Sequence, residues 1–244
     1  MTINFAHRGY RAMYPENTLL AFRKAIEAGC DGIELDIQLS KDGELVVTHD
    51  EDLWRTTGYD GAVRDMTLAG LRALDAGGGE RIPLLSEYFE LITGMPGMDH
   101  PPITNIELKN SEVSYDGMEE KALALVRERG VENRVVFSSF NHESVIKLKK
   151  LAPEIPCGFL CSGKPDIDAL AALMRDTGVD FLHPDIASID SQFIEAAARR
   201  GIRLNIWTVN DEPTMRRLIE QGAHGIFTDD PGLLTRALRE IGGR

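Results

Sequence analysis

The sequence predicts an α/β fold, a single closed barrel of eight parallel strands in which each strand is followed by a helix. Short apolar runs typical of buried strands alternate with amphipathic stretches about eight times along the 244 residues. Such alternation implies parallel pairing through right-handed crossovers. An open doubly wound sheet fits the same order, but no glycine-rich dinucleotide-binding sequence follows the first strand, so we favour the (β/α)₈ barrel.

The elements follow from local patterns taken in chain order. We expect strands at Ile3–Ala6, Gly32–Leu39, Thr104–Leu108, Val135–Ser138, Cys157–Leu160, Phe181–His183, Arg203–Trp207 and Gly225–Thr228. We expect helices at Thr18–Ala28, Ser86–Ile92, Met118–Arg129, His142–Leu151, Ile167–Thr177, Ser191–Arg200, Glu212–Gln221 and Pro231–Ile241. Asn17 and Ser191 are the expected N-caps of their helices, and a glycine just past the end marks several other helix boundaries.

The connection between the second and third barrel strands is much longer than the few residues typical of such loops. The sequence KDG at 41–43 predicts a tight turn, and Glu44–Thr48 predicts a return strand that forms a hairpin. The remainder, about residues 52–80, is interpreted as an insertion above the barrel. We therefore expect one catalytic domain over residues 1–244, with this insertion included.

Composition and charge exclude several classes of protein. The net charge of −12 argues against a nucleic-acid partner, and it means that an anionic substrate would need local cations. No apolar run approaches the length of a membrane span, and the first residues lack the pattern of a secretory signal. Three cysteines cannot all pair, which indicates reduced thiols and a cytoplasmic protein. The sequence does not indicate an oligomeric state.

The stretch GIELDIQL at 32–39 alternates apolar and acidic residues with the period of a strand. In a closed barrel one strand face meets the helices and the other meets the lumen, so Glu34 and Asp36 are predicted to point inward. The stretch NIELKN at 105–110 repeats the pattern and places Glu107 and Lys109 on one face. We expect these side chains near the C-terminal ends of the strands, where barrel active sites lie.

Three inward carboxylates, Glu34, Asp36 and Glu107, would repel one another in an enclosed site. Protonation or a bound divalent cation would relieve the repulsion, and all-oxygen ligands favour Mg²⁺ or Ca²⁺ over zinc. The alternative is a purely structural network in which these acids pair with Arg8 and Lys109. We favour the metal site.

A hard cation beside Arg8 and Lys109 would form a cationic pocket suited to phosphate. His7 and His49 also follow predicted strands at this end, and an imidazole titrates close to neutral pH, so these two are candidates for proton transfer. Phe140 and Trp207 are expected in the pocket wall, with core packing as the alternative. The remaining histidines are interpreted as structural: His100, His142, His183 and His224.

Taken in order, these motifs resemble those of the bacterial glycerophosphodiester phosphodiesterases. The matching pieces are HRGYRAMYPENTLLAF, GIELDIQLSKDGELVVTHDEDLWRTTG, IELK, FSSFN, WTVN and GIFTDDPG, which together extend over nearly the whole chain. The resemblance implies a TIM barrel with a small insertion after the second strand. It also implies an enzyme that uses a divalent cation, Mg²⁺ or Ca²⁺, to cleave glycerophosphodiesters into sn-glycerol 3-phosphate and an alcohol.

Carried over by position, the resemblance makes the three carboxylates metal ligands, the two histidines an acid–base pair and the two cations a phosphate clamp. It further implies that Glu16 helps to position the acid–base group or the substrate, with Asn17 supporting the site, and that Phe140 and Trp207 line the glycerol side. Asp50 and Arg55 fit either the site or the scaffold of the insertion. Arg11 stands where the family commonly has a small residue, which bears on access or on the alcohol group.

Several alternatives remain open at this point. A related barrel phosphodiesterase could act on a lysophospholipid or a phosphoinositide, although the insertion lacks the apolar or basic loop that a membrane-facing enzyme would need. A non-catalytic binding barrel would be expected to have lost the acids and histidines, and all are present. The sequence does not distinguish water from the glycerol 2-hydroxyl as nucleophile, nor the acid from the base among the two histidines.

Overall fold

The computed structural model describes residues 1–95, 100–163 and 165–242. It confirms the closed barrel. The parallel strands of the barrel are β1 (Ile3–His7), β2 (Gly32–Leu39), β4 (Ile103–Leu108), β5 (Val135–Ser139), β6 (Cys157–Cys161), β7 (Phe181–Pro184), β8 (Arg203–Ile206) and β9 (Gly225–Thr228). Each pairs with its neighbour, and β1 pairs with both β2 and β9, which closes the sheet on itself.

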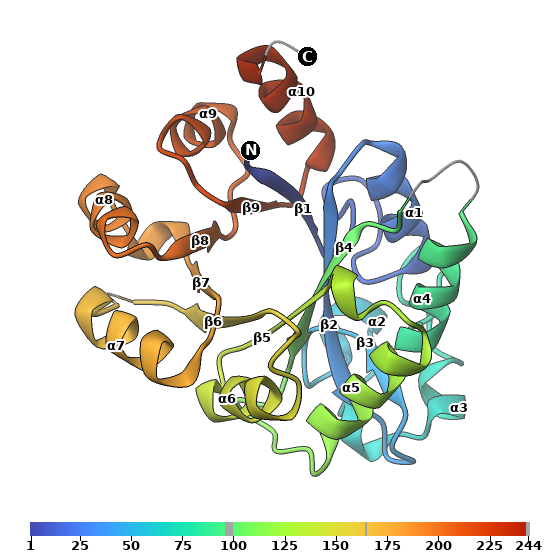
Figure 1. Cartoon of the computed structure of the whole chain (residues 1–244). Helices are drawn as coiled ribbons and strands as arrows, with labels where there is room; N and C mark the ends of the chain where they lie inside the picture. The colour runs from blue at the N-terminus through green and yellow to red at the C-terminus, as the bar shows by residue number, and fades with distance from the viewer. Residues whose placement is uncertain (96–99, 164, 243–244) are drawn as a thin grey trace.

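Helices surround the barrel on the outside (Figure 1). They are α1 (Leu19–Glu27), α4 (Leu85–Gly94), α5 (Met118–Glu128), α6 (His142–Leu151), α7 (Ile167–Thr177), α8 (Ser191–Arg199), α9 (Glu212–Glu220) and α10 (Pro231–Gly242), with short 3₁₀ helices η2 (Glu132–Arg134) and η3 (Ile186–Ser188) in two connections. The boundaries agree with the sequence prediction to within one or two residues. The core lies between the outer face of the sheet and these helices, as the alternating strand pattern requires.

Two predicted N-caps are wrong by one residue. Thr18, not Asn17, caps α1, because its side chain accepts a hydrogen bond from the amide of Ala21. Asn17 instead adopts a left-handed backbone conformation with φ of 56° and directs its amide into the barrel. Asp190, not Ser191, caps α8 by accepting from the amide of Phe193. Ser, Thr, Asn and Asp are all good N-caps, so the choice within each pair depends on the path of the preceding loop.

The long connection after β2 begins with β3 (Leu45–Val47), which pairs antiparallel with β2 as the predicted hairpin requires. It continues through α2 (Trp54–Thr57), η1 (Val63–Asp65) and α3 (Leu68–Leu71). Apolar side chains from this segment form a small core of their own, consisting of Val46, Leu53, Val63, Leu71 and Ile82. None of the helices in the described ranges has the length and apolar character that a membrane span requires.

Candidate active site

Two neighbouring strands, β2 and β4, bring the three predicted carboxylates together. Glu34 and Asp36 lie two residues apart on β2, so both point to the lumen, and Glu107 on β4 is the register partner of Asp36. All three are almost completely removed from solvent, with relative exposures of 4%, 0% and 9%. One carboxylate oxygen from each lies within 4.8 Å of the others.

The donor set suits a hard divalent cation. Burial, together with the charges of Asp36 and Glu107, raises the pKa of Glu34 well above its ordinary value. Burial and the charge of Asp36 raise the pKa of Glu107 to about 7. Burial would also raise the pKa of Asp36, but attraction to Arg8 and other cations keeps it low. Oδ1 of Asp36 is buried without a hydrogen-bond partner among the described residues. A bound cation would satisfy that oxygen and relieve the repulsion.

The loop after β1 turns sharply to reach this cluster. Arg8 has a φ of 54°, which is uncommon for a residue with a side chain, and its amide donates to Oε2 of Glu34 at 2.9 Å. Gly9 follows with a φ of 81°, and a Cβ there would come within 2.8 Å of Ala21. The unusual backbone therefore serves two close approaches, one to the carboxylate and one to α1.

Two cations flank the carboxylates. Nζ of Lys109 lies 3.0 Å from Oε1 of Glu107, and Nε of Arg8 lies 3.4 Å from Oδ2 of Asp36. Asn17 adds a neutral donor, because its amide nitrogen lies 2.8 Å from the same Asp36 oxygen. The structural ion-pair network considered above is thus present in part, but within the described ranges it leaves Oδ1 of Asp36 without a partner. Arg8 and Lys109 are placed where they could hold an anion beside the cluster.

His49 follows β3 and belongs to a chain of polar side chains that crosses the mouth of the barrel. Its Nδ1 lies 2.6 Å from Asp50, and the other oxygen of Asp50 lies 2.5 Å from Nε of Arg55 in α2. Arg55 also contacts Glu16, at 2.6 Å from Oε1. Glu16 in turn contacts Arg8 at 2.9 Å, so it joins the insertion to the loop after β1. Asp50 and Arg55 therefore contact the site and are not confined to the scaffold.

Glu16 is an anchor for guanidinium groups. Arg8, Arg11 and Arg55 all contact its carboxylate, at 2.9, 2.8 and 2.6 Å. Burial would raise the pKa of Glu16, but these hydrogen bonds and charges hold it well below its ordinary value. The carboxylate is therefore ionised. It fixes the three guanidinium groups in place and holds no proton that it could transfer.

Gln38 is a buried residue that supports the site and that the sequence analysis did not single out. Its amide nitrogen lies within 3.1 Å of the backbone oxygens of Thr48, His49 and Asp50, so it fastens the segment that carries His49 to β2. The hydroxyl of Tyr115 donates to the side-chain oxygen of Gln38 at 2.9 Å. The sequence could have indicated this role, because Gln38 lies two residues after Asp36 and so on the same inward face of β2 as Glu34 and Asp36.

Asp229 is the second residue that sequence reasoning missed. It directly follows β9, next to β1, and its Oδ1 lies 2.6 Å from Nδ1 of His7. The segment GIFTDDPG was recognised, but its two adjacent aspartates give no indication of which one faces the lumen. Burial lowers the pKa of His7, and the hydrogen bond to Asp229 opposes that effect.

The remaining wall is aromatic. Phe140 follows β5 and Trp207 follows β8, and their rings meet edge to face at 5.7 Å between centroids. The Trp207 indole donates to the backbone oxygen of His183 at 2.8 Å, which fixes the ring against the barrel. Both aromatic residues line a cavity of about 60 Å³ together with His7, Arg8, Glu34, His49, Asn105, Glu107, Leu160 and Phe227.

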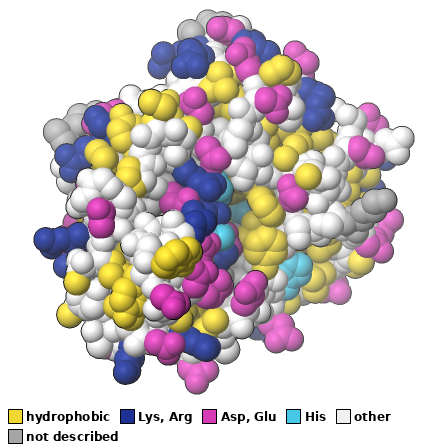
Figure 2. All heavy atoms as spheres, turned by 180° about the vertical axis from the view of Figure 1, so that it is seen from behind, with side chains coloured by type: hydrophobic (Ala, Val, Ile, Leu, Met, Phe, Trp, Pro, Cys, Tyr) yellow, Lys and Arg dark blue, Asp and Glu magenta, His cyan; other side chains and the backbone are white. Residues whose placement is uncertain are grey.

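Figure 2 shows this face, where Lys, Arg and His side chains gather in a central hollow with hydrophobic side chains on one side and acidic ones on the other.

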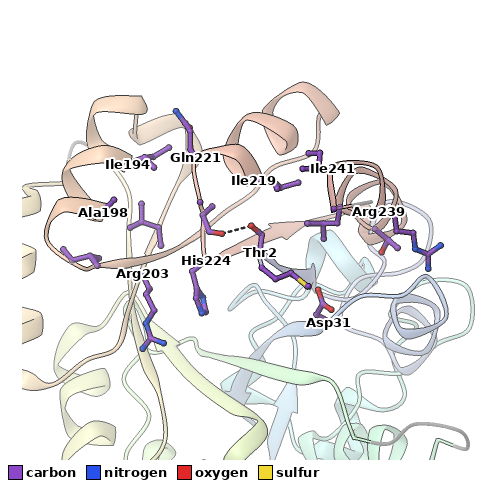
Figure 3. Close-up of a pocket in the computed structure, with 18 of the residues that line it drawn as sticks. Thr2, Asp31, Ile194, Ala198, Arg203, Ile219, Gln221, His224, Arg239 and Ile241 are labelled. Carbon is purple, nitrogen blue, oxygen red and sulfur yellow. Dashed lines mark hydrogen bonds between the residues drawn. The ribbon is translucent and has the colours of Figure 1, made fainter. Parts of the chain in front are cut away.

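A larger cavity of about 810 Å³ lies elsewhere, between the ends of α8, α9 and α10 and the beginnings of β1 and β9 (Figure 3). Thr2, Arg203 and His224 contribute to its lining along with apolar side chains such as Ile194 and Ile219. It contains none of the three clustered carboxylates. Because barrel enzymes carry their reactive groups at the C-terminal ends of the strands, we assign the active site to the smaller cavity.

The fold and the position of the site are those of the (β/α)₈-barrel enzymes. Residues 7–233 match the model of the glycerophosphoryl diester phosphodiesterase family. A glycerophosphodiester phosphodiesterase of Caldanaerobacter subterraneus subsp. tengcongensis is 43% identical, with 99% of each chain covered. The chain therefore belongs to the glycerophosphoryl diester phosphodiesterase family, and it is a phosphoric diester hydrolase.

Solved structures agree with this assignment. The crystal structure of a putative glycerophosphoryl diester phosphodiesterase from Silicibacter pomeroyi has a TM-score of 0.89 at 29% identity, covering 99% of this chain and 94% of that one. An Oleispira antarctica phosphodiesterase, solved with the product sn-glycerol-3-phosphate, has a TM-score of 0.82 at 32% identity, covering 96% and 95%. The resemblance noted in the sequence is confirmed, and the non-catalytic alternative is wrong.

Proposed function

We propose that the protein hydrolyses glycerophosphodiesters to sn-glycerol 3-phosphate and an alcohol with the help of one divalent cation, Mg²⁺ or Ca²⁺. The observation that carries this is the convergence of Glu34, Asp36 and Glu107, whose ligand oxygens lie within 4.8 Å of one another in a buried site. The Oleispira relative supports the product, because its structure holds sn-glycerol-3-phosphate. When bound, the cation would supply positive charge that polarises the phosphoryl group.

The protein's own side chains would then bind and orient the substrate. Arg8 and Lys109 flank the carboxylates and would hold the phosphate oxygens. Phe140 and Trp207 form the apolar wall against which the glycerol carbons would pack. Glu16 would act through Arg8, since its carboxylate fixes that guanidinium.

Proton transfer would be carried out by His7 and His49, one taking the proton of the nucleophile and the other protonating the departing alkoxide. Both rings line the same cavity as Glu34 and Glu107. Each has its Nδ1 against an aspartate, so Nε2 would be the nitrogen that exchanges the proton; in His49 this atom also lies 3.2 Å from the ammonium group of Lys109.

We further propose that the whole chain forms one catalytic domain with residues 52–80 as its insertion. The support is that this segment contributes Arg55 to the site while packing its apolar side chains in a separate small core. A cytoplasmic location is proposed on the cysteines, because Cys30, Cys157 and Cys161 are all free in the described structure.

A panel of substrates tests the reaction. Release of sn-glycerol 3-phosphate, coupled to glycerol-3-phosphate dehydrogenase, should be observed with glycerophosphocholine, glycerophosphoethanolamine and glycerophosphoglycerol. Lysophosphatidylcholine should have a kcat/KM at least about tenfold lower, because the described cavity, with a volume of about 60 Å³, is too small to take up an acyl chain. Leu53 and Leu71 of the insertion are buried in its own core and are not free to bind a lipid.

The Asp36→Asn variant provides the background rate for every substrate in that panel. Faster turnover of lysophosphatidylcholine than of the three water-soluble diesters would favour the lipid-directed alternative. No release of sn-glycerol 3-phosphate from any diester would contradict the proposed function.

A further inference from the structure

The closure of the barrel brings the end of the chain back to its beginning. β9 pairs with β1, and Asp229, the first residue after β9, faces His7, the last residue of β1. Nδ1 of His7 and Oδ1 of Asp229 are 2.6 Å apart, although 222 positions separate the two residues. We propose that Asp229 is the positioning residue of His7, holding its imidazole in the tautomer and orientation needed for proton transfer. The inference rests on the proposed function.

Asp229 is itself held in a fixed position. Its Oδ2 accepts a hydrogen bond from the amide nitrogen of Asn210 at 2.8 Å, and its backbone amide donates to the Asn210 side-chain oxygen at 2.9 Å. Oδ1 is left for His7, with a guanidinium nitrogen of Arg11 at 3.5 Å from the same atom. Because each oxygen has its own partner, the carboxylate plane is set, and with it the orientation of the imidazole ring.

The hydrogen bond also determines where the proton of His7 lies. An ionised carboxylate can only accept, so Nδ1 of His7 must be the donor, and Nε2 of the neutral ring carries the free lone pair. Hydrogen bonding to His7 and the charge of Arg11 outweigh burial and lower the pKa of Asp229, which keeps this carboxylate ionised. His7 lines the cavity that contains Glu34 and Glu107.

The other candidate histidine has the same arrangement. Nδ1 of His49 lies 2.6 Å from Oδ1 of Asp50. An independent contact fixes the same tautomer, because the ammonium group of Lys109, which can only donate, lies 3.2 Å from Nε2 of His49. The site thus contains two Asp–His pairs. Asp50 is anchored by Arg55 of the insertion, and Asp229 by Asn210 of the loop after β8.

A double-mutant cycle tests the inference on the cation-loaded protein. Asp229→Asn should lower kcat by about 10- to 100-fold, the usual effect of losing an orienting carboxylate, with KM changed less than about threefold. In the His7→Ala background the same change should lower kcat no further, because the residue through which Asp229 acts is gone. Two results would overturn the inference. One is a further 10- to 100-fold loss of kcat when Asp229→Asn is added to His7→Ala, and the other is an unchanged kcat in Asp229→Asn alone.

Asp230→Asn is the matched control. This neighbouring carboxylate accepts from the amide of Leu233 at the start of α10 and is not hydrogen-bonded to His7. Asparagine also caps helices well, so kcat should stay near the wild-type value. If Asp229→Asn does not fold, Asn210→Ala offers a second route, because it removes the anchor of Asp229 and should give a smaller loss of kcat that again disappears in the His7→Ala background.

Nitrogen-15 NMR of histidine-labelled protein gives a readout independent of turnover. The His7 signals are those missing from His7→Ala. Above the ordinary histidine pKa of about 6.5, they should show a protonated Nδ1 in the wild type and loss of that preference in Asp229→Asn, whose amide can donate as well as accept. An unchanged tautomer in the variant would contradict the inference. Wild-type turnover of His7→Ala would instead contradict the acid–base role in the proposed function, whereas a slow His7→Ala with a normal Asp229→Asn defeats only the inference about Asp229.

Discussion

Removal of divalent cations should abolish hydrolysis of glycerophosphodiesters, and addition of Mg²⁺ or Ca²⁺ should restore it. The three buried carboxylates bring ligand oxygens within 4.8 Å of one another, and Oδ1 of Asp36 has no hydrogen-bond partner in the part of the chain that the structure describes. A cation at this position is expected to stabilise the transition state by several kcal/mol, and each 1.36 kcal/mol corresponds to a factor of ten in rate. The loss should therefore be about three orders of magnitude or more, measured as kcat after dialysis against EDTA.

Calorimetry separates binding of the cation from catalysis. The wild type should bind one equivalent of Ca²⁺ or Mg²⁺, and Asp36→Asn should bind it far more weakly. Glu119→Gln is the matched control, because Glu119 is also a buried carboxylate but hydrogen-bonds to Ser144 and Asn110, away from the cluster. Full activity in excess EDTA, or equal binding by Asp36→Asn, would exclude the metal site.

The carboxylate cluster could be predicted from the sequence because it depends on two simple periodicities. Alternation within GIELDIQL puts Glu34 and Asp36 on one face of the strand, and parallel pairing places Glu107 beside Asp36. The strand order follows from the repeated alternation of strands and helices. The same reasoning placed His7 and Arg8 at the end of β1, where the structure has them.

Contacts between loops could not be predicted in this way, because no periodicity governs them. Arg55 reaches Glu16 across 39 positions, and Asp229 reaches His7 across 222. The error at the start of α1 has a similar origin. Asn17 and Thr18 are both good caps, and the sequence does not indicate that Asn17 donates to the buried Asp36 while Thr18 caps the helix.

Replacing His49 by alanine should slow turnover by about 10²–10⁴-fold, the usual contribution of a positioned general acid or base. The ring is held between Asp50 at Nδ1 and Lys109 at Nε2, so its loss removes a fixed proton-transfer group from the cavity. The measurement is kcat with glycerophosphocholine in the presence of the cation. His224→Ala is the matched control and should keep kcat near that of the wild type, because His224 lies in the larger cavity at the opposite end of the barrel.

The choice of leaving group then assigns the role of His49. A nitrophenolate departs without being protonated, whereas an alkoxide such as that of choline requires a proton. If His49 is the general acid, the loss in His49→Ala should shrink markedly with a nitrophenyl phosphodiester; if it is the general base, the loss should be similar for both substrates. The same pair of measurements on His7→Ala should give the opposite pattern, since one reaction cycle needs one group of each kind. A near-normal rate of His49→Ala with glycerophosphocholine would remove this residue from the mechanism.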